Sequence, residues 1–244
     1  MARPFHGLGV FRYRNAGLIT GDGYGRYNIW EHSATVKALY ARRCRLESEE
    51  MTCHAQAAEL LAVHVREGET LLDAGCGSGY FFHSLRTRAI DLDYLGVDAA
   101  PSLVGIGQEI LPAHGLRADR LRVMRIEDLD GSVDHAVCIN VLSNIDNYHR
   151  PLERLLKMAR KSVILRESCD DDASYAYVED RYLDPGVDLK VHVNTYALGE
   201  LTEFIRCYGY DVEVVRDRRA GDEPELVIDY PHYWKFLVCL RNRG

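Results

Sequence analysis

The chain has 244 residues, of which 47% are hydrophobic and 27% charged, and its formal net charge is −7 at pH 7. This composition is typical of a soluble globular protein of one domain with at most an appended lobe, and it excludes a disordered or collagen-like chain. The excess of acidic residues argues against a dedicated nucleic-acid binder, whose affinity depends on neutralising phosphates.

The cysteines and the apolar runs indicate the compartment. The seven cysteines include no C-x-x-C pair, so no zinc or redox motif is present. Their odd number, and the position of Cys138 and Cys239 inside apolar runs, favours reduced and buried thiols. No apolar run approaches the ~20 residues that span a bilayer, and the first residues have no hydrophobic signal core. We therefore expect a cytoplasmic protein with no membrane partner.

Residues 1–69 are predicted to form an aromatic N-terminal segment followed by a helical cap. Glycines at positions 17, 21, 23 and 25 favour turns over regular structure. Apolar residues then recur at helical spacing and predict two helices, Glu31–Arg45 and Met51–Val65.

Between residues 70 and 168, short apolar strands alternate with helical patterns. The predicted strands are 70–75, 94–98, 121–126, 134–142 and 162–168, and the predicted helices are 81–87, 102–114 and 152–160. This alternation predicts an α/β fold with a doubly wound, mostly parallel sheet joined by right-handed crossovers.

The remaining residues are predicted to form a lid and the end of the sheet. Residues 169–196 show no strong period and are interpreted as an inserted lid segment. Residues 197–244 contain a helical pattern at 197–208 and two strand patterns, 210–217 and 234–241. We expect these two strands to form an antiparallel hairpin that closes the edge of the sheet.

The most informative motif is Leu-Leu-Asp-Ala-Gly-Cys-Gly-Ser-Gly at residues 71–79. A strand ends in Asp73, and three glycines at alternate positions then open a helix, so the backbone can approach a ligand closely. The third glycine is misplaced for a dinucleotide fingerprint, and Asp73 would repel a pyrophosphate. These features disfavour a nicotinamide-dependent oxidoreductase and suit a cationic ligand. Asp98 ends the next strand, where an acidic side chain accepts the hydroxyls of a ribose.

This motif, with Asp98 after it, resembles motif I and the following acidic residue of class I S-adenosylmethionine-dependent methyltransferases. The resemblance covers residues 70–167 and includes Arg-Ile-Glu-Asp-Leu at 125–129 and the fourth strand with its loop at 134–146. It implies a Rossmann-like sheet of seven strands, with S-adenosylmethionine lying across the carboxyl ends of the first, second and fourth strands.

The resemblance also implies which residues bind the cofactor. They are Asp73 near the methionine amine, Gly75 and Gly77 along the methionine and ribose, Asp98 on the ribose hydroxyls, Ala99, Ile126 and Glu127 around the adenine, and Asn140 at the methionine or sulfonium. Many relatives have Asp-Ala where this chain has Arg125-Ile126, which moves the expected contact with the adenine amine to Glu127 or Asp128. Tyr40 and Arg43, three apart on one helix, are expected to cover the methionine carboxylate. Alternatively, Tyr40 is simply a packed aromatic residue.

Two histidines are candidates for a catalytic base. A hydroxyl acceptor benefits from a general base, most often His, whereas an amine acceptor needs only to be neutral. His192 lies in the predicted lid, and His149 lies in the loop after the fourth strand. Each also has a structural interpretation, because His192 can belong to one face of a short strand and His149 can fix a turn at a helix start.

Aromatic and polar residues outside the core are predicted to bind the methyl acceptor. They are Tyr24, Tyr27, Trp30, Asn144, Glu167, Asn194 and Tyr196. The alternatives are that the aromatic side chains only pack the outer segments onto the sheet and that Glu167 is a solvated residue. The aspartates at 170–172 are interpreted as a solvated turn, so no metal is expected.

The sequence therefore predicts an S-adenosylmethionine-dependent methyltransferase that acts on a hydroxyl or amine of a small molecule, such as a specialised metabolite or a sugar. The alternatives are methylation of a protein or RNA, and a non-catalytic cofactor-binding partner subunit. Neither nucleic acid nor a membrane is expected as a partner, and a homodimer is left open.

Overall fold

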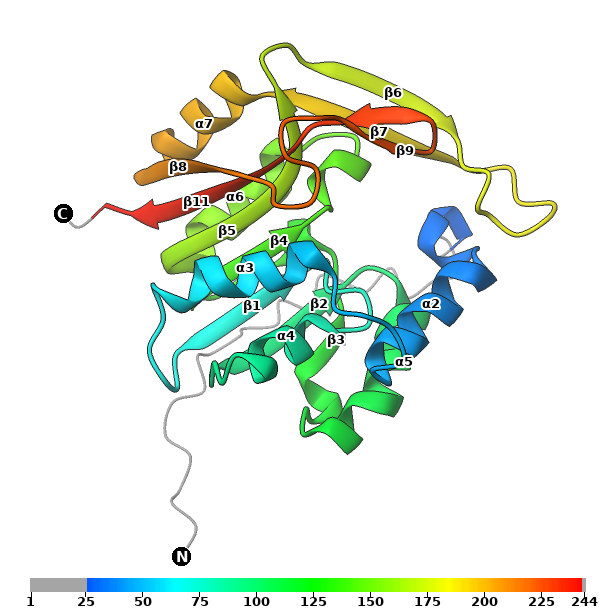
Figure 1. The fold of residues 1–244 in the computed structure, drawn as a ribbon, viewed down its shortest axis with the longest axis horizontal. Coiled ribbons are helices and arrows are strands. Elements are labelled where there is room, and N and C mark those ends of the chain that lie inside the picture. Colours follow the sequence, from blue (N-terminus) through cyan, green and yellow to red (C-terminus); the bar gives the residue numbers. More distant parts are fainter. Residues whose placement is uncertain (1–25, 243–244) are drawn as a thin grey trace, which may run out of the picture.

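A computed structural model describes residues 26–242, which form a central sheet with helices on both faces (Figure 1). Along its main path the strand order is β3-β2-β1-β4-β5-β11-β8. These strands are β1 (Thr70–Ala74), β2 (Asp93–Asp98), β3 (Leu121–Val123), β4 (Val133–Ile139), β5 (Ala159–Asp170), β8 (Tyr210–Arg216) and β11 (Trp234–Arg241). β11 runs antiparallel to its two neighbours, and the other pairings along this path are parallel. The predicted fold class is therefore confirmed.

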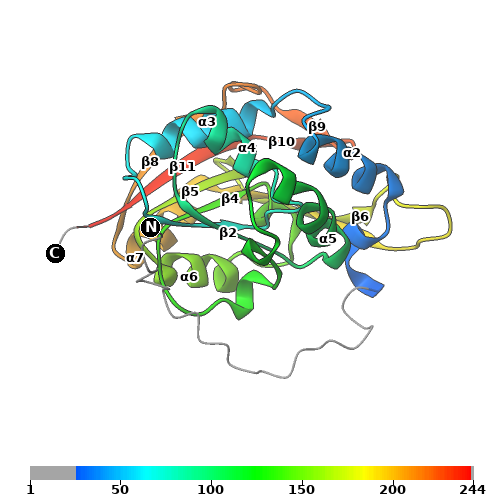
Figure 2. The ribbon, with the colours of Figure 1, turned by 90° about the horizontal axis from the view of Figure 1, so that it is seen from below.

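The helices form two layers. They are α2 (Ala34–Cys44), α3 (Thr52–Ala62), α4 (Phe81–Thr87), α5 (Pro101–Ile110), α6 (His149–Met158) and α7 (Leu198–Cys207). α3 and α4 cover one face of the sheet, and α6 and α7 cover the other (Figure 2). Neighbouring strand residues alternate between the two cores, so that Leu71 packs with α3 and α4 and Leu72 packs with α6. Cover on both faces explains why the strands are almost continuously apolar.

The predicted helix 31–45 is interrupted near its start. A short 3-10 helix, η1 (Ile29–Glu31), comes first, and α2 begins only at Ala34. The hydroxyl of Ser33 accepts a hydrogen bond from the Val36 amide at 3.2 Å and so caps α2. A serine that caps a helix has non-helical backbone angles, which separates η1 from α2.

The segment 169–196 has more regular structure than expected. It contains β6 (Ser174–Glu179) and β7 (Lys190–Ala197), which pair antiparallel. We call these two strands the ribbon. The end of β7 pairs in parallel with the end of β5, so the ribbon extends the sheet above the ends of the central strands (Figure 1).

The C-terminal strands differ from the predicted edge hairpin. β8 and β11 are antiparallel, as expected, but β11 lies between β5 and β8, and β8 is the edge. The run Phe236–Cys239 is buried throughout, whereas β8 exposes several side chains. A strand that is apolar along its whole length is most stable inside the sheet. The connection between them holds a two-stranded sheet, β9 (Glu225–Val227) and β10 (Tyr230–His232).

The cysteines are reduced and mostly buried, as the sequence predicts. All seven cysteines are free thiols, and only Cys207 is exposed. Within residues 26–242, no helix combines the length and apolar character that a membrane span requires.

Candidate functional site

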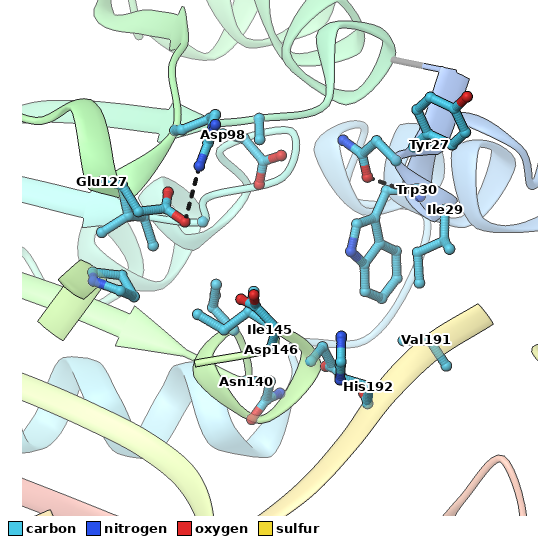
Figure 3. A pocket seen from close by; sticks show the side chains of 18 of the residues that line it. Tyr27, Ile29, Trp30, Asp98, Glu127, Asn140, Ile145, Asp146, Val191 and His192 are labelled. Atoms are coloured by element: carbon cyan, nitrogen blue, oxygen red, sulfur yellow. Dashed lines mark hydrogen bonds and ion pairs between the residues drawn. The ribbon is translucent and has the colours of Figure 1, made fainter. Parts of the chain in front are cut away.

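A cavity of about 400 Å³ lies at the carboxyl ends of β1, β2 and β4 (Figure 3). Its floor comes from the turns after these strands, and η1 and the ribbon cover it; we call η1 and the ribbon together the roof. Residues from both the predicted cofactor site and the predicted acceptor site line it: Tyr27, Trp30, Gly75, Asp98, Ala99, Ile126, Glu127, Asn140, Asn144 and His192. Tyr24 lies outside the described residues.

Asp98 is anchored at the end of β2. Its two carboxylate oxygens accept hydrogen bonds from the amides of Gly77 at 2.7 Å and Ala100 at 2.8 Å. Burial raises the pKa of Asp98 above its usual value, although these amide bonds favour the charged form. A carboxylate can accept about four hydrogen bonds. Asp98 can therefore still accept both hydroxyls of a ribose.

The turn after β1 makes room for a side chain of the cap. Gly77 has a φ of +56°, and a Cβ atom there would lie 2.2 Å from Cε1 of Tyr40. The Tyr40 ring also contacts the ring of Tyr80 edge-on, with centroids 5.3 Å apart. Arg43 lies over both rings and donates a hydrogen bond to the Tyr80 hydroxyl at 3.0 Å. Tyr40 and Arg43 are not among the cavity-lining residues, and their role beside a methionine carboxylate stays a prediction.

Gly77→Ala is expected to lower the free energy of unfolding by about 1–3 kcal/mol beyond the cost of its backbone angle, because the new methyl group would overlap the Tyr40 ring. Gly68→Ala is the matched control, since Gly68 also has a positive φ but no atom would lie within 4 Å of the new Cβ. Chemical denaturation of both variants measures the difference, and equal destabilisation would contradict the proposed packing.

Asp73 lies below the turn and outside the cavity lining. Its carboxylate accepts a hydrogen bond from the Tyr94 hydroxyl at 2.5 Å. Burial raises the pKa of Asp73 to about 7, the charge of Asp98 adds to this, and the Tyr94 hydrogen bond opposes it. A positively charged ligand nearby would favour the ionised form of both aspartates. Direct contact between Asp73 and a methionine amine stays a prediction.

The adenine end of the predicted site lies after β3. The 3-10 helix η4 (Ile126–Asp128) follows β3 there, and the Met124 amide donates to the backbone oxygen of Asp98 at 2.8 Å. Glu127 forms an ion pair with Arg125 at 3.3 Å at the edge of the cavity (Figure 3). Ile126, Glu127 and Ala99 thus share one end of the cavity, as the sequence predicts for an adenine site.

Asn140 is held by a residue that the sequence analysis did not select. It has a φ of +59°, which is unusual for a residue other than glycine. Its amide donates to the backbone oxygen of Arg166 at 2.8 Å, and its side-chain oxygen accepts a hydrogen bond from the Arg166 guanidinium. Arg166 is itself buried, bound to Asp217 at 2.6 Å and stacked over Trp234. Its position directly after the apolar run Val163–Leu165 was the available signal.

Glu167 is fully buried and faces the protein rather than the cavity. Its carboxylate accepts hydrogen bonds from the amides of Val141, Leu142 and Ser143 and from the Ser143 hydroxyl, at 2.8–3.2 Å. Burial raises the pKa of Glu167 to about 7, although these hydrogen bonds lower it. In this position Glu167 fixes the turn η5 (Leu142–Asn144) at the end of β4. It is not solvated, and it does not line the cavity.

Three of the predicted acceptor-binding residues join η5 to the ribbon. Asn144 donates to the backbone oxygen of His192 at 3.0 Å, and Asn194 donates to that of Ile145 at 2.7 Å. The Tyr196 hydroxyl donates to the Leu142 oxygen at 2.5 Å. Of these three, Asn144 lines the cavity, whereas Asn194 and Tyr196 are buried behind it.

The two candidate bases occupy different places. His192 lies on β7, lines the cavity, and has its ring 4.5 Å from the ring of Tyr177. His149 begins α6 outside the cavity lining, where it stacks on Tyr148 and contacts the side chain of Asn147. The structure thus brings only His192 together with Asp98 and Asn140.

Hydrogen bonds join the residues directly after η1 to the loop between β6 and β7, about 150 residues further along the chain. The Ser33 hydroxyl donates to the Tyr182 oxygen at 2.7 Å, and the Ala34 amide donates to the Asp184 carboxylate at 2.9 Å. The Asp184 amide in turn donates to the His32 oxygen at 2.7 Å. Ile29 of η1 also packs against Val191 and Val193 of β7, so the two parts of the roof are in contact.

Residues 72–164 match a family model described as a methyltransferase domain. The similar solved structures include magnesium protoporphyrin IX methyltransferase from Synechocystis PCC 6803 with bound S-adenosylmethionine (15% identity, TM-score 0.54, covering 91% of this chain and 92% of that one). They also include an S-adenosylmethionine-dependent methyltransferase from Clostridium acetobutylicum (12%, 0.57, 84% and 97%) and 1,6-didemethyltoxoflavin-N1-methyltransferase from Burkholderia thailandensis (18%, 0.52, 81% and 81%).

The matched domain contains the glycine turn, Asp98 and the strand that leads to Asn140, and the likeness to the solved structures extends over most of the chain. The cofactor of this family is S-adenosylmethionine, as the sequence predicted. Residues 72–164 thus match a methyltransferase domain, and the chain has the fold of S-adenosylmethionine-dependent methyltransferases.

Proposed function

We propose that this protein transfers the methyl group of S-adenosylmethionine to a hydroxyl or amine of a small molecule. The observation that carries this proposal is a single cavity of about 400 Å³ that holds both predicted sites. It extends from the cofactor half, around Asp98, Ala99, Ile126 and Glu127, to the acceptor half, around Trp30, Tyr177 and His192, and the roof borders the acceptor half. A concave site of this size suits a small acceptor.

The residues of the cofactor half fit S-adenosylmethionine. Asp98 would bind the ribose hydroxyls, Ala99, Ile126 and Glu127 would surround the adenine, and Asn140 would contact the methionine end. When bound, the cofactor supplies a methyl group on a positively charged sulfur. The contribution of the protein is then to hold the acceptor atom in line with that methyl group and to exclude water.

The acceptor half suggests how an acceptor proton is removed. His192 is the cavity-lining histidine, and its backbone is fixed by Asn144. It would accept the proton of an acceptor hydroxyl during transfer. An amine acceptor would need only to bind in its neutral form, and His192 would then orient it. Two of the similar structures are named for small acceptors, a magnesium porphyrin and a toxoflavin precursor, which supports this acceptor class.

His192→Ala is expected to lower kcat about 100-fold, within the range that general bases contribute, with cofactor affinity unchanged. Turnover is measured as S-adenosylhomocysteine formation by the isolated chain with a mixed panel of small hydroxyl and amine acceptors. Added imidazole should partly restore the rate of His192→Ala. The control is His64→Ala, which changes a histidine outside the cavity lining.

Two results would contradict the proposal. An unchanged kcat in His192→Ala would remove the assigned base. An isolated wild-type chain that binds the cofactor but methylates no member of the panel would favour a protein or RNA substrate, or a role as a non-catalytic subunit.

A further inference from the structure

We propose that the methyl acceptor is a planar aromatic compound with a ring hydroxyl, which binds between Trp30 and the paired rings of His192 and Tyr177. This inference rests on the proposed function and specifies its substrate class.

Three aromatic and three aliphatic residues line the part of the cavity beyond the cofactor half: Tyr27, Trp30, Tyr177, Ile29, Ile145 and Val191. Asn28, Asn144, Asp146, Lys190 and His192 line it as well. Trp30 extends from η1 into the same part of the cavity as His192 (Figure 3). Tryptophan and tyrosine rings offer flat surfaces on which another ring can stack.

Two polar side chains of this half each have one partner in the protein, and two others are exposed. The Asn28 side-chain oxygen accepts the Trp30 amide at 3.2 Å, and the Asn144 amide group donates to the backbone of His192 at 3.0 Å. Asp146 and Lys190 are exposed. The imidazole of His192 lines the same part of the cavity, with its ring centroid 4.5 Å from that of Tyr177.

This distribution distinguishes between classes of hydroxyl acceptor. A sugar carries a hydroxyl on almost every carbon, and several of them would be buried against Trp30, Ile145 and Val191 without hydrogen-bond partners. Buried hydroxyls without partners are unfavourable. A phenol presents flat apolar faces and one hydroxyl, which matches one imidazole among aromatic and aliphatic side chains.

The acidity of the acceptor hydroxyl also favours a phenol. The phenol of tyrosine has a pKa of about 10, and the hydroxyl of a sugar is a much weaker acid. A histidine base can therefore assist a phenol more readily. In the transfer, the acceptor oxygen bonds to the methyl carbon as the carbon–sulfur bond breaks. The electron pair of that bond stays on the sulfur of S-adenosylhomocysteine, and the hydroxyl proton passes to His192 and then to solvent.

The two residues next to Trp30 in the sequence, Ile29 and Glu31, hold it in place. Ile29 packs against Val191 and Val193 of the ribbon. The carboxylate of Glu31 accepts a hydrogen bond from the Ser102 amide at the start of α5, at 3.0 Å. A ring that is fixed before the ligand arrives loses little conformational freedom on binding, so its contacts are available to the acceptor.

The test compares two classes of probe on the full chain saturated with S-adenosylhomocysteine. Calorimetry measures the binding of three phenols (2-naphthol, 8-hydroxyquinoline and caffeic acid) and of two sugars (methyl β-D-glucopyranoside and UDP-glucose). We expect at least one phenol to bind tighter than either sugar and to accept a labelled methyl group from S-adenosylmethionine. Trp30→Leu should weaken that binding at least tenfold and leave the affinity for S-adenosylhomocysteine within twofold.

The matched control is Tyr230→Leu, which removes a partly exposed aromatic ring on β10 that does not line the cavity; it should leave binding of the phenol unchanged. Thermal unfolding confirms that both variants are folded. Tighter binding of a sugar, no binding of any phenol at millimolar concentration, or unaltered phenol binding in Trp30→Leu would overturn this inference. Failure of the wild-type chain to bind S-adenosylhomocysteine would instead overturn the proposed function, so the two failures are distinguishable.

Discussion

Replacement of Asp98 by alanine is expected to weaken binding of S-adenosylmethionine by a factor of about 100 or more. Hydrogen bonds to a charged group contribute about 1.5–3 kcal/mol each, and a ribose can donate two of them to this carboxylate. Each 1.4 kcal/mol corresponds to a tenfold change in affinity. The same substitution removes the acceptors of the Gly77 and Ala100 amides, so the glycine turn itself would be less well ordered.

Isothermal titration calorimetry with S-adenosylhomocysteine measures this effect without requiring an acceptor. Asp119→Ala is a suitable control, because Asp119, on η3 (Ala118–Arg120), is exposed and forms its ion pair with the exposed Arg117. Circular dichroism establishes that the Asp98→Ala variant is folded. Affinity within threefold of the wild-type value would mean that Asp98 does not bind the ribose.

Arg166→Met is expected to lower the free energy of unfolding by about 3–5 kcal/mol, as is typical when one partner of a buried ion pair is removed. Arg166 and Asp217 are both almost fully buried, and the guanidinium also binds Asn140. Burial alone would raise the pKa of Asp217. The Arg166 hydrogen bond and the amides of Ala220 and Arg219 outweigh burial and hold that pKa below its usual value. Without Arg166, a buried carboxylate would lack its counter-charge.

Urea denaturation of four proteins tests this account: wild type, Arg166→Met, Asp217→Leu and the double variant. The double variant should be more stable than the sum of the two single losses predicts, because it leaves no unpaired buried charge. Since the folded-state pKa of Asp217 is lowered, its contribution is full at pH 7 and is lost as the pH falls below the usual aspartate value of about 3.9. Additive losses would show that the two residues do not stabilise each other.

The sheet could be predicted because its strands carry local signals. β1, β2, β4 and β5 are short apolar runs bounded by glycine or acidic residues, and the cover on both faces makes them easy to find. The position of β11 could not be found in this way. Its apolar run indicates a buried strand, but its place between β5 and β8 depends on contacts between segments far apart in sequence.

The cofactor half of the site was predictable for a related reason. Gly75 and Asn140 directly follow a strand and Asp98 ends one, and the carboxyl ends of parallel strands meet at one edge of a sheet. Glu167 lies inside β5, near its end, and its carboxylate binds the amides of η5 inside the protein. The strand pattern gives the position of a residue along a strand but does not show which neighbours its side chain meets.

For the residues around the acceptor half, too, the strand pattern does not show which neighbours each side chain meets. His192 and Trp30 lie about 160 residues apart, and only the contact of η1 with the ribbon brings them together. Asn194 and Tyr196 follow His192 on the same face of β7, but their side chains bind η5. The sequence therefore indicates a polar and aromatic segment without distinguishing cavity walls from their supports.

The central position of β11 has a consequence for amide hydrogen exchange. Its residues alternate between hydrogen-bonding partners on β5 and on β8 over seven registered pairs on each side. Exchange of the whole strand requires the separation of both neighbours, so the amides that bond to β5 should exchange by global unfolding rather than by local fraying. Deuterium uptake should accordingly be slow across Phe236–Leu240 and fast on the exposed edge of β8, although β11 is the last strand along the chain.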